Sequence, residues 1–151
     1  MKKEAMESVI RYGSDILSSE KMQITKKNIQ HRRVSVYEHS LGVALMSVYI
    51  IKRFKIDADI PSVVRGALLH DYFLYDWHKP DKSHRLHGFT HARCALKNAA
   101  EDFSLNDVET DIILKHMFPL NISFPKYKES IIVSVADKIC ALLETLSVNY
   151  F

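Results

Sequence analysis

The sequence predicts an all-α protein folded as a single-domain helical bundle of about five to seven helices. Glycine and proline number only four each, so long loops and many tight turns are not expected. Apolar residues recur at steps of three and four along most of the chain, which is the period of an amphipathic helix. No segment shows the strict alternation of apolar and polar residues that is typical of a half-buried strand.

Length and composition narrow the class of protein. The 151 residues fit one domain, residues 1–151, and the 47% hydrophobic content excludes a disordered chain. The net charge of +3 comes without a basic tail or block, so we expect a small anionic partner and no obligate nucleic acid. No apolar run reaches the roughly 20 residues that span a bilayer, and the start of the chain lacks a signal-peptide core. With only Cys94 and Cys140, which lack metal-type spacing, we expect a cytoplasmic protein without a membrane partner.

Three helices are predicted in the first half of the chain. The first covers about residues 2–19 and has as its apolar face Ala5, Val9, Ile10, Ile16 and Leu17. A polar stretch over residues 18–33 contains a break and a short helical turn. The second helix carries on one face Val36, His39, Val43, Met46 and Ile50. The third begins at Asp59, an acidic cap followed by Pro61, and runs into His70 and Asp71.

Three further helices follow a polar and aromatic loop over residues 73–88, a place where substrate contacts are expected. The fourth helix starts near Thr90, because Gly88 favours loop before it. The fifth follows the cap-like Ser104 and Asp107 and stops before Pro119. The last runs from about residue 127 towards 148, and because it is apolar on most sides we expect it in the centre of the bundle.

Six polar side chains interrupt the apolar faces of these helices: His39, His70, Asp71, His91, His116 and Asp137. Any one of the histidines alone is explained by a hydrogen bond in the core, and Asp137 alone by a buried ion pair with Lys or Arg. Together they would leave several buried charges to be satisfied separately, whereas one shared metal centre satisfies them all. Nitrogen and carboxylate donors without thiolates suit Mn, Fe, Co, Ni or Zn better than Mg.

The order of these residues resembles the HD-domain superfamily of metal-dependent phosphohydrolases over residues 34–143. The segment Arg-Gly-Ala-Leu-Leu-His-Asp at 65–71 and the triplet Ala-Asp-Lys at 136–138 are similar to its characteristic blocks. The resemblance implies a metal site in the core of the bundle, with one ion held by His39, His70, Asp71 and Asp137. It also implies a second ion held by His91 and His116, with Asp71 bridging the two.

The resemblance and the metal chemistry together predict a hydrolase that cleaves a small phosphoester of nucleotide type with metal-activated water, at a centre of one metal ion or, as we favour, two. Asp71 and His70 form its catalytic core. The branch of the family that cleaves cyclic dinucleotides is not supported, because Met117 follows His116 where that branch has a second histidine. Two alternatives stay open: a dinuclear iron oxygenase of the same superfamily, and a regulatory ligand-binding module with a weakly active metal site.

Cationic side chains near this constellation are candidates for binding the phosphate group. They are Lys138, Arg93, Arg65, His87 and the loop residues Lys79, Lys82 and Arg85. Solvated surface charge is the competing interpretation of the loop residues, and His87 is as well explained as a general acid or an exposed side chain. A homodimer is a possible assembly.

Overall fold

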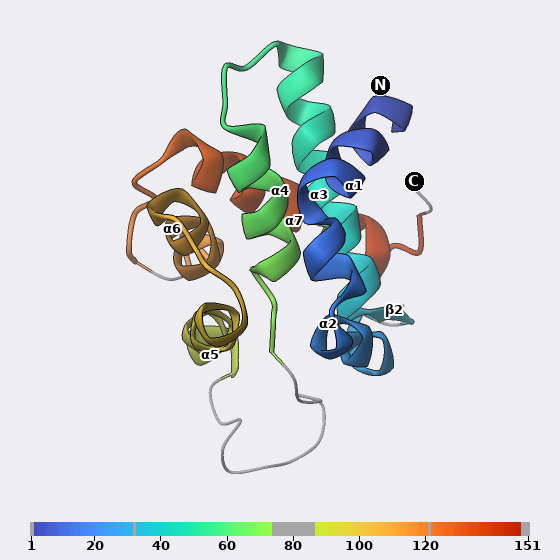
Figure 1. Cartoon of the computed structure of the whole chain (residues 1–151), viewed down its shortest axis with the longest axis vertical. Helices are drawn as coiled ribbons and strands as arrows, with labels where there is room; N and C mark the ends of the chain where they lie inside the picture. The colour runs from blue at the N-terminus through green and yellow to red at the C-terminus, as the bar shows by residue number, and fades with distance from the viewer. Residues whose placement is uncertain (1, 32, 74–86, 121, 149–151) are drawn as a thin grey trace.

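The computed structural model describes residues 2–31, 33–73, 87–120 and 122–148, and in them the chain is all-α as predicted (Figure 1). One 3₁₀ turn, Thr25–Lys27, and one short antiparallel hairpin accompany the helices. The elements in chain order are α1 (Lys2–Ser18), α2 (Glu20–Ile24), β1 (Ile29–His31), β2 (Val34–Ser35), α3 (Val36–Phe54), α4 (Ile60–Leu69), α5 (His87–Asp102), α6 (Asp107–Lys115) and α7 (Lys128–Thr145). None of the helices in these ranges is long and apolar enough to cross a membrane.

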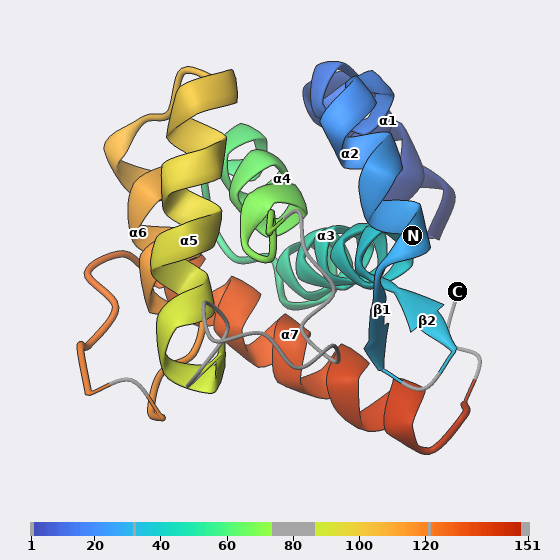
Figure 2. The ribbon, with the colours of Figure 1, turned by 90° about the horizontal axis from the view of Figure 1, so that it is seen from below.

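Helix α4 occupies the centre of the bundle. It packs against α1 and α3 on one side, against α5 and α6 on the other, and against α7 (Figure 2). Most of its ten residues are buried, and its sequence is apolar apart from Ser62 and Arg65. The C-cap residues of α4 and α6, His70 and His116, lie with their ring centroids 4.9 Å apart.

The prediction that the last helix lies in the centre is wrong. Helix α7 packs on α3, α4 and α6 with one face, and its opposite face is exposed, including Ile131, Val135 and Leu142. Apolar residues all round a helix indicate a central position only when neighbours cover every side. In the described residues, neighbouring elements cover only one side of α7.

Local signals fix most of the helix starts. Asp59 caps α4 by accepting a hydrogen bond from the Ser62 amide, with proline in the first turn, as predicted. Helix α6 is capped by Asn106 and Glu109, which form a capping box, and not by the predicted Ser104. The Asn106 side chain accepts the Glu109 amide and the Glu109 side chain accepts the Asn106 amide, which is why the helix starts there.

Three other expectations need correction. Ile10 lies outside the buried face of α1, which instead closes on α4 at Gly13. Helix α5 begins at His87, three residues before the predicted start, so Gly88 lies inside it. The polar stretch before α3 contains the hairpin of β1 and β2, where no strand was expected.

Candidate metal centre

The six predicted side chains converge in the interior of the bundle. His39 lies on α3, His91 on α5 and Asp137 on α7, while His70 and His116 are the C-cap residues of α4 and α6 and Asp71 follows His70. Each is 9% exposed or less. Five helices therefore contribute to one buried polar cluster, in the arrangement that the apolar periodicity implied.

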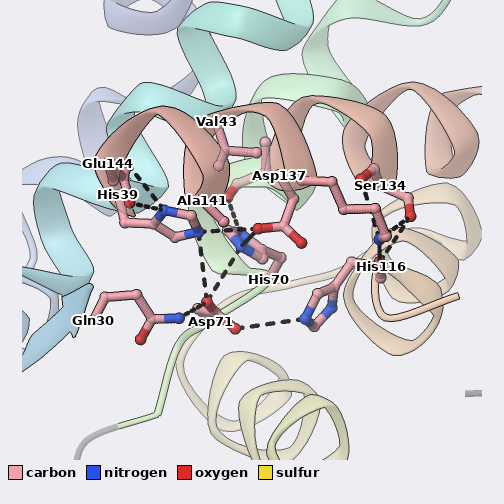
Figure 3. A network of polar contacts seen from close by, with 12 residues as sticks. Gln30, His39, Val43, His70, Asp71, His116, Ser134, Asp137, Ala141 and Glu144 are labelled. Atoms are coloured by element: carbon pink, nitrogen blue, oxygen red, sulfur yellow. Dashed lines mark hydrogen bonds and ion pairs between the residues drawn. The ribbon is translucent and has the colours of Figure 1, made fainter. Parts of the chain in front are cut away.

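Asp71 lies between two pairs of histidines. Its Oδ2 atom is 3.4 Å from Nε2 of His70 and 3.8 Å from Nε2 of His39. Its Oδ1 atom is 3.3 Å from Nε2 of His91 and 3.5 Å from Nε2 of His116. Figure 3 shows the carboxylate between His39 and His70 on one side and His116 on the other. Each oxygen thus serves a different pair of imidazoles.

Asp137 joins His39, His70 and Oδ2 of Asp71 as the fourth residue of one group. Its Oδ1 atom is 3.1 Å from Nε2 of His39 and 3.7 Å from Nε2 of His70. His39, His70 and Asp137 lie close enough together to hold one ion, and so do His70, Asp71 and His116. The donors are nitrogen and oxygen atoms of the kind that Mn, Fe, Co, Ni and Zn accept.

The second ring nitrogen of three histidines is bound outside the cluster. Nδ1 of His70 donates to the carbonyl of Ala67 at 2.7 Å, and Nδ1 of His116 donates to the carbonyl of Ile113 at 2.8 Å. Nδ1 of His39 is 2.9 Å from Oε2 of Glu144. Such contacts fix the tautomer and turn the Nε2 lone pair towards the centre, as in histidines that bind metals.

Two side-chain atoms of the six predicted residues lack a hydrogen-bond partner. They are Nε2 of His70 and Oδ1 of Asp71, and both are buried. Buried polar atoms are nearly always satisfied, and leaving one unpaired costs about 1–3 kcal/mol. A divalent cation would satisfy both atoms, so the residues present fit a metal.

The electrostatics of the cluster point the same way. Burial works to lower the pKa of His39, but the carboxylates of Asp137 and Glu144 outweigh it and raise this pKa to about 9. Burial also opposes the charge on Asp71, yet the adjacent His70 and the other imidazoles hold its pKa well below the usual range. In the metal-free protein, protons on His39 and His70 therefore balance the carboxylates. A cation would replace those protons.

Two residues of the cluster were missed in the sequence. Nε2 of Gln30, on β1, donates to Oδ2 of Asp71 at 2.6 Å. Glu144 lies seven residues after Asp137, two turns further along the buried face of α7. The seven-residue spacing of Asp137 and Glu144 on one face of this helix was a usable signal. Gln30 offered none, because the hairpin that carries it was not expected.

Lys138 and Arg65, two of the cations predicted to bind phosphate, contact other groups of the protein. Nζ of Lys138 donates to the carbonyl of His116 and to Oγ of Ser134, each at 2.9 Å, and so fixes the end of α6. Arg65 pairs with Asp15 and Glu109. Arg93 is exposed on α5, and His87 is the first residue of that helix. Lys79, Lys82 and Arg85 lie outside the described residues, as does the side chain of His87.

The sequence matches the HD domain family over residues 36–142. The chain belongs to the HD-domain family, the superfamily of metal-dependent phosphohydrolases. No curated protein and no solved structure gave a significant match. The part of this HD domain that matches contains all six converging residues, whereas Gln30 and Glu144 lie just outside it. The flanks of the HD domain thus supply the contacts that orient Asp71 and His39.

Proposed function

We propose that this HD domain is a metal-dependent phosphohydrolase that cleaves a small phosphoester of nucleotide type at a two-metal centre. One observation carries the proposal: the two oxygens of Asp71 face two separate pairs of imidazoles. A carboxylate placed in this way is suited to bridge two ions. The first place would be held by His39, His70, Asp71 and Asp137, and the second by Asp71, His91 and His116.

The chemistry of phosphoester hydrolysis agrees with this set of residues. The reaction needs an activated water and neutralised phosphate charge, and divalent ions supply both without a covalent step on the protein. The protein's own part is to hold the donors in place. Glu144 orients His39, Gln30 orients Asp71, and Lys138 with Ser134 fixes the backbone of His116.

The substrate class follows from charge. The carboxylates of the centre are buried, while the net charge of the chain is +3. The sequence between α4 and α5 supplies Lys79, Lys82 and Arg85, and Arg93 is exposed on α5 six residues after His87. These cations would contact the phosphate group of a substrate that reaches the centre from the α5 side.

Product formation from a panel of substrates, followed by chromatography of the nucleotides and by the absorbance of released nitrophenol, tests the proposal. The protein would be loaded separately with Mn²⁺, Fe²⁺, Co²⁺, Ni²⁺ and Zn²⁺ and assayed with nucleotides, cyclic nucleotides and nitrophenyl phosphates. We expect turnover with at least one metal, and a loss of more than about 100-fold in Asp71→Asn, because removing a ligand exceeds the 10–100-fold cost of removing an outer partner. Asp102→Asn is the matched control, because Asp102 contacts Lys21 and Tyr72 outside the centre.

Two results would contradict the proposal. One is the absence of turnover with every metal and substrate, with nucleotides shifting only the melting temperature, which would indicate a ligand-binding module. The other is oxygen consumption by an iron-loaded centre without hydrolysis of any of these substrates, which would indicate an oxygenase.

A further inference from the structure

The outer face of α7 carries a straight row of exposed apolar side chains. They are between 37% and 62% exposed, and we call them the α7 stripe: Ile131, Val135, Ile139, Leu142 and Leu146. Helix α7 packs on α3, α4 and α6, and Figure 2 shows all three on the same side of it. A monomeric protein rarely leaves a contiguous apolar row of this kind in water. The α7 stripe therefore has the character of an interface.

The spacing of the α7 stripe is almost unchanged when it is read backwards. Ile131 lies as far before the midpoint between positions 138 and 139 as Leu146 lies after it, and Val135 and Leu142 are related in the same way. Ile139 lies next to the midpoint. A second α7 running antiparallel would set Ile131 against Leu146 and Val135 against Leu142. A surface that matches itself in this way fits a two-fold symmetric interface between identical chains.

The charges on α7 are compatible with such a pair. Its carboxylates, Glu129, Asp137 and Glu144, are all buried on the inner face. The ammonium group of Lys138 is held by the carbonyl of His116 and by Ser134, away from the stripe. Lys128 is exposed at the first residue of the helix. Its Nζ atom is 3.9 Å from Oδ2 of Asp57, and in an antiparallel pair Lys128 falls beyond the end of the partner helix, away from the stripe.

We propose that two copies of this chain pair antiparallel through the α7 stripe. The row spans about 22 Å, the rise of fifteen residues of helix. One helix pair buries less than the roughly 800 Å² per partner of a standard interface, so we expect dissociation in the micromolar range. The same helix carries Asp137 and Glu144 on its inner face, so pairing would support the wall of the metal centre from outside. The proposal does not depend on the activity of that centre.

Sedimentation velocity at about 1–200 µM protein tests the pairing. We expect the full chain to reach twice its mass of 17.4 kDa as the concentration rises. The double variant Val135→Glu and Leu142→Glu should stay at the mass of one chain. Ile10→Glu and Phe54→Glu are matched controls, because these residues are equally exposed on α1 and α3, and both should still dimerise. Far-UV circular dichroism and zinc binding confirm that each variant is folded.

Disulfide cross-linking tests the orientation in a Cys94→Ser, Cys140→Ala background. Antiparallel pairing predicts that Ile139→Cys cross-links to itself, and that Val135→Cys cross-links to Leu142→Cys but not to itself. Efficient self-linking of Val135→Cys would show a parallel pair and overturn the proposal. So would a monomer at 200 µM, a dimer that the double variant leaves intact, or vesicle binding by the wild type that the double variant abolishes.

Discussion

Glu144 provides the sharpest test of how the centre is built. Its carboxylate lies 2.9 Å and 3.2 Å from Nδ1 of His39, and it is 5% exposed. A buried hydrogen bond to a charged group contributes about 1.5–3 kcal/mol, which corresponds to roughly 10–150-fold in an equilibrium constant. Glu144→Ala should therefore weaken the ion held by His39, His70 and Asp137 by about 10–100-fold, the range seen when an outer partner of a ligand is removed.

Competition titrations with a chromophoric zinc chelator measure this change. The affinity for the ion held by His39, His70 and Asp137 should fall. The affinity for the ion held by His91 and His116 should stay the same. Glu129→Ala is the matched control, because Glu129 is a buried carboxylate on the same helix that accepts the amide of Asp59 away from the centre. It should lower stability and leave zinc affinity unchanged. Zinc affinities of Glu144→Ala within threefold of the wild type at both places would refute this account of His39.

Three further predictions follow from single contacts. Gln30→Leu removes the donor to Oδ2 of Asp71, so metal affinity should fall by about tenfold in a chelator competition, and an unchanged affinity would contradict this role of Gln30. Gly66→Ala places a Cβ atom 2.7–2.9 Å from Ile112 of α6, so urea unfolding should show a loss of about 1–3 kcal/mol, and an unchanged midpoint would contradict this packing. The pKa of His39 is raised from 6.5 to about 9 in the metal-free protein, so its stabilising contribution is complete below pH 6.5 and is lost towards pH 9. The melting temperature measured with chelator should therefore fall between pH 6.5 and 9. The melting temperature of the metal-bound protein should fall less, because metal binding favours the deprotonated ring. Equal falls with and without metal would contradict this role of His39.

The sequence was sufficient for the helices and for the convergence of the six polar residues. Periodicity places His39 on the same face as Val36 and Val43, and the same reasoning directs Asp137 inwards beside Val133 and Cys140. Because a helix buries one face against its neighbours, polar residues on several inward faces had to meet.

The features that the sequence did not predict depend on which helix faces are covered by neighbouring helices and strands. Periodicity identifies the apolar residues of α7, but only the packing of the other helices decides that Val135 is exposed and Val133 buried. Glu144 has the spacing of an inward-facing residue, but only the position of His39 shows what its carboxylate binds. Gln30 lies in a hairpin of two very short strands, whose formation is decided by contacts with α3 and α7 and not by its own residues.

Anomalous diffraction from crystals of the metal-loaded protein tests the central claim most directly. The account predicts two peaks on either side of Asp71, each about 2.0–2.2 Å from its ligand atoms. One should be bound by His39, His70 and Asp137, and the other by His91 and His116. A single peak with His91 and His116 unbound would contradict the two-metal centre.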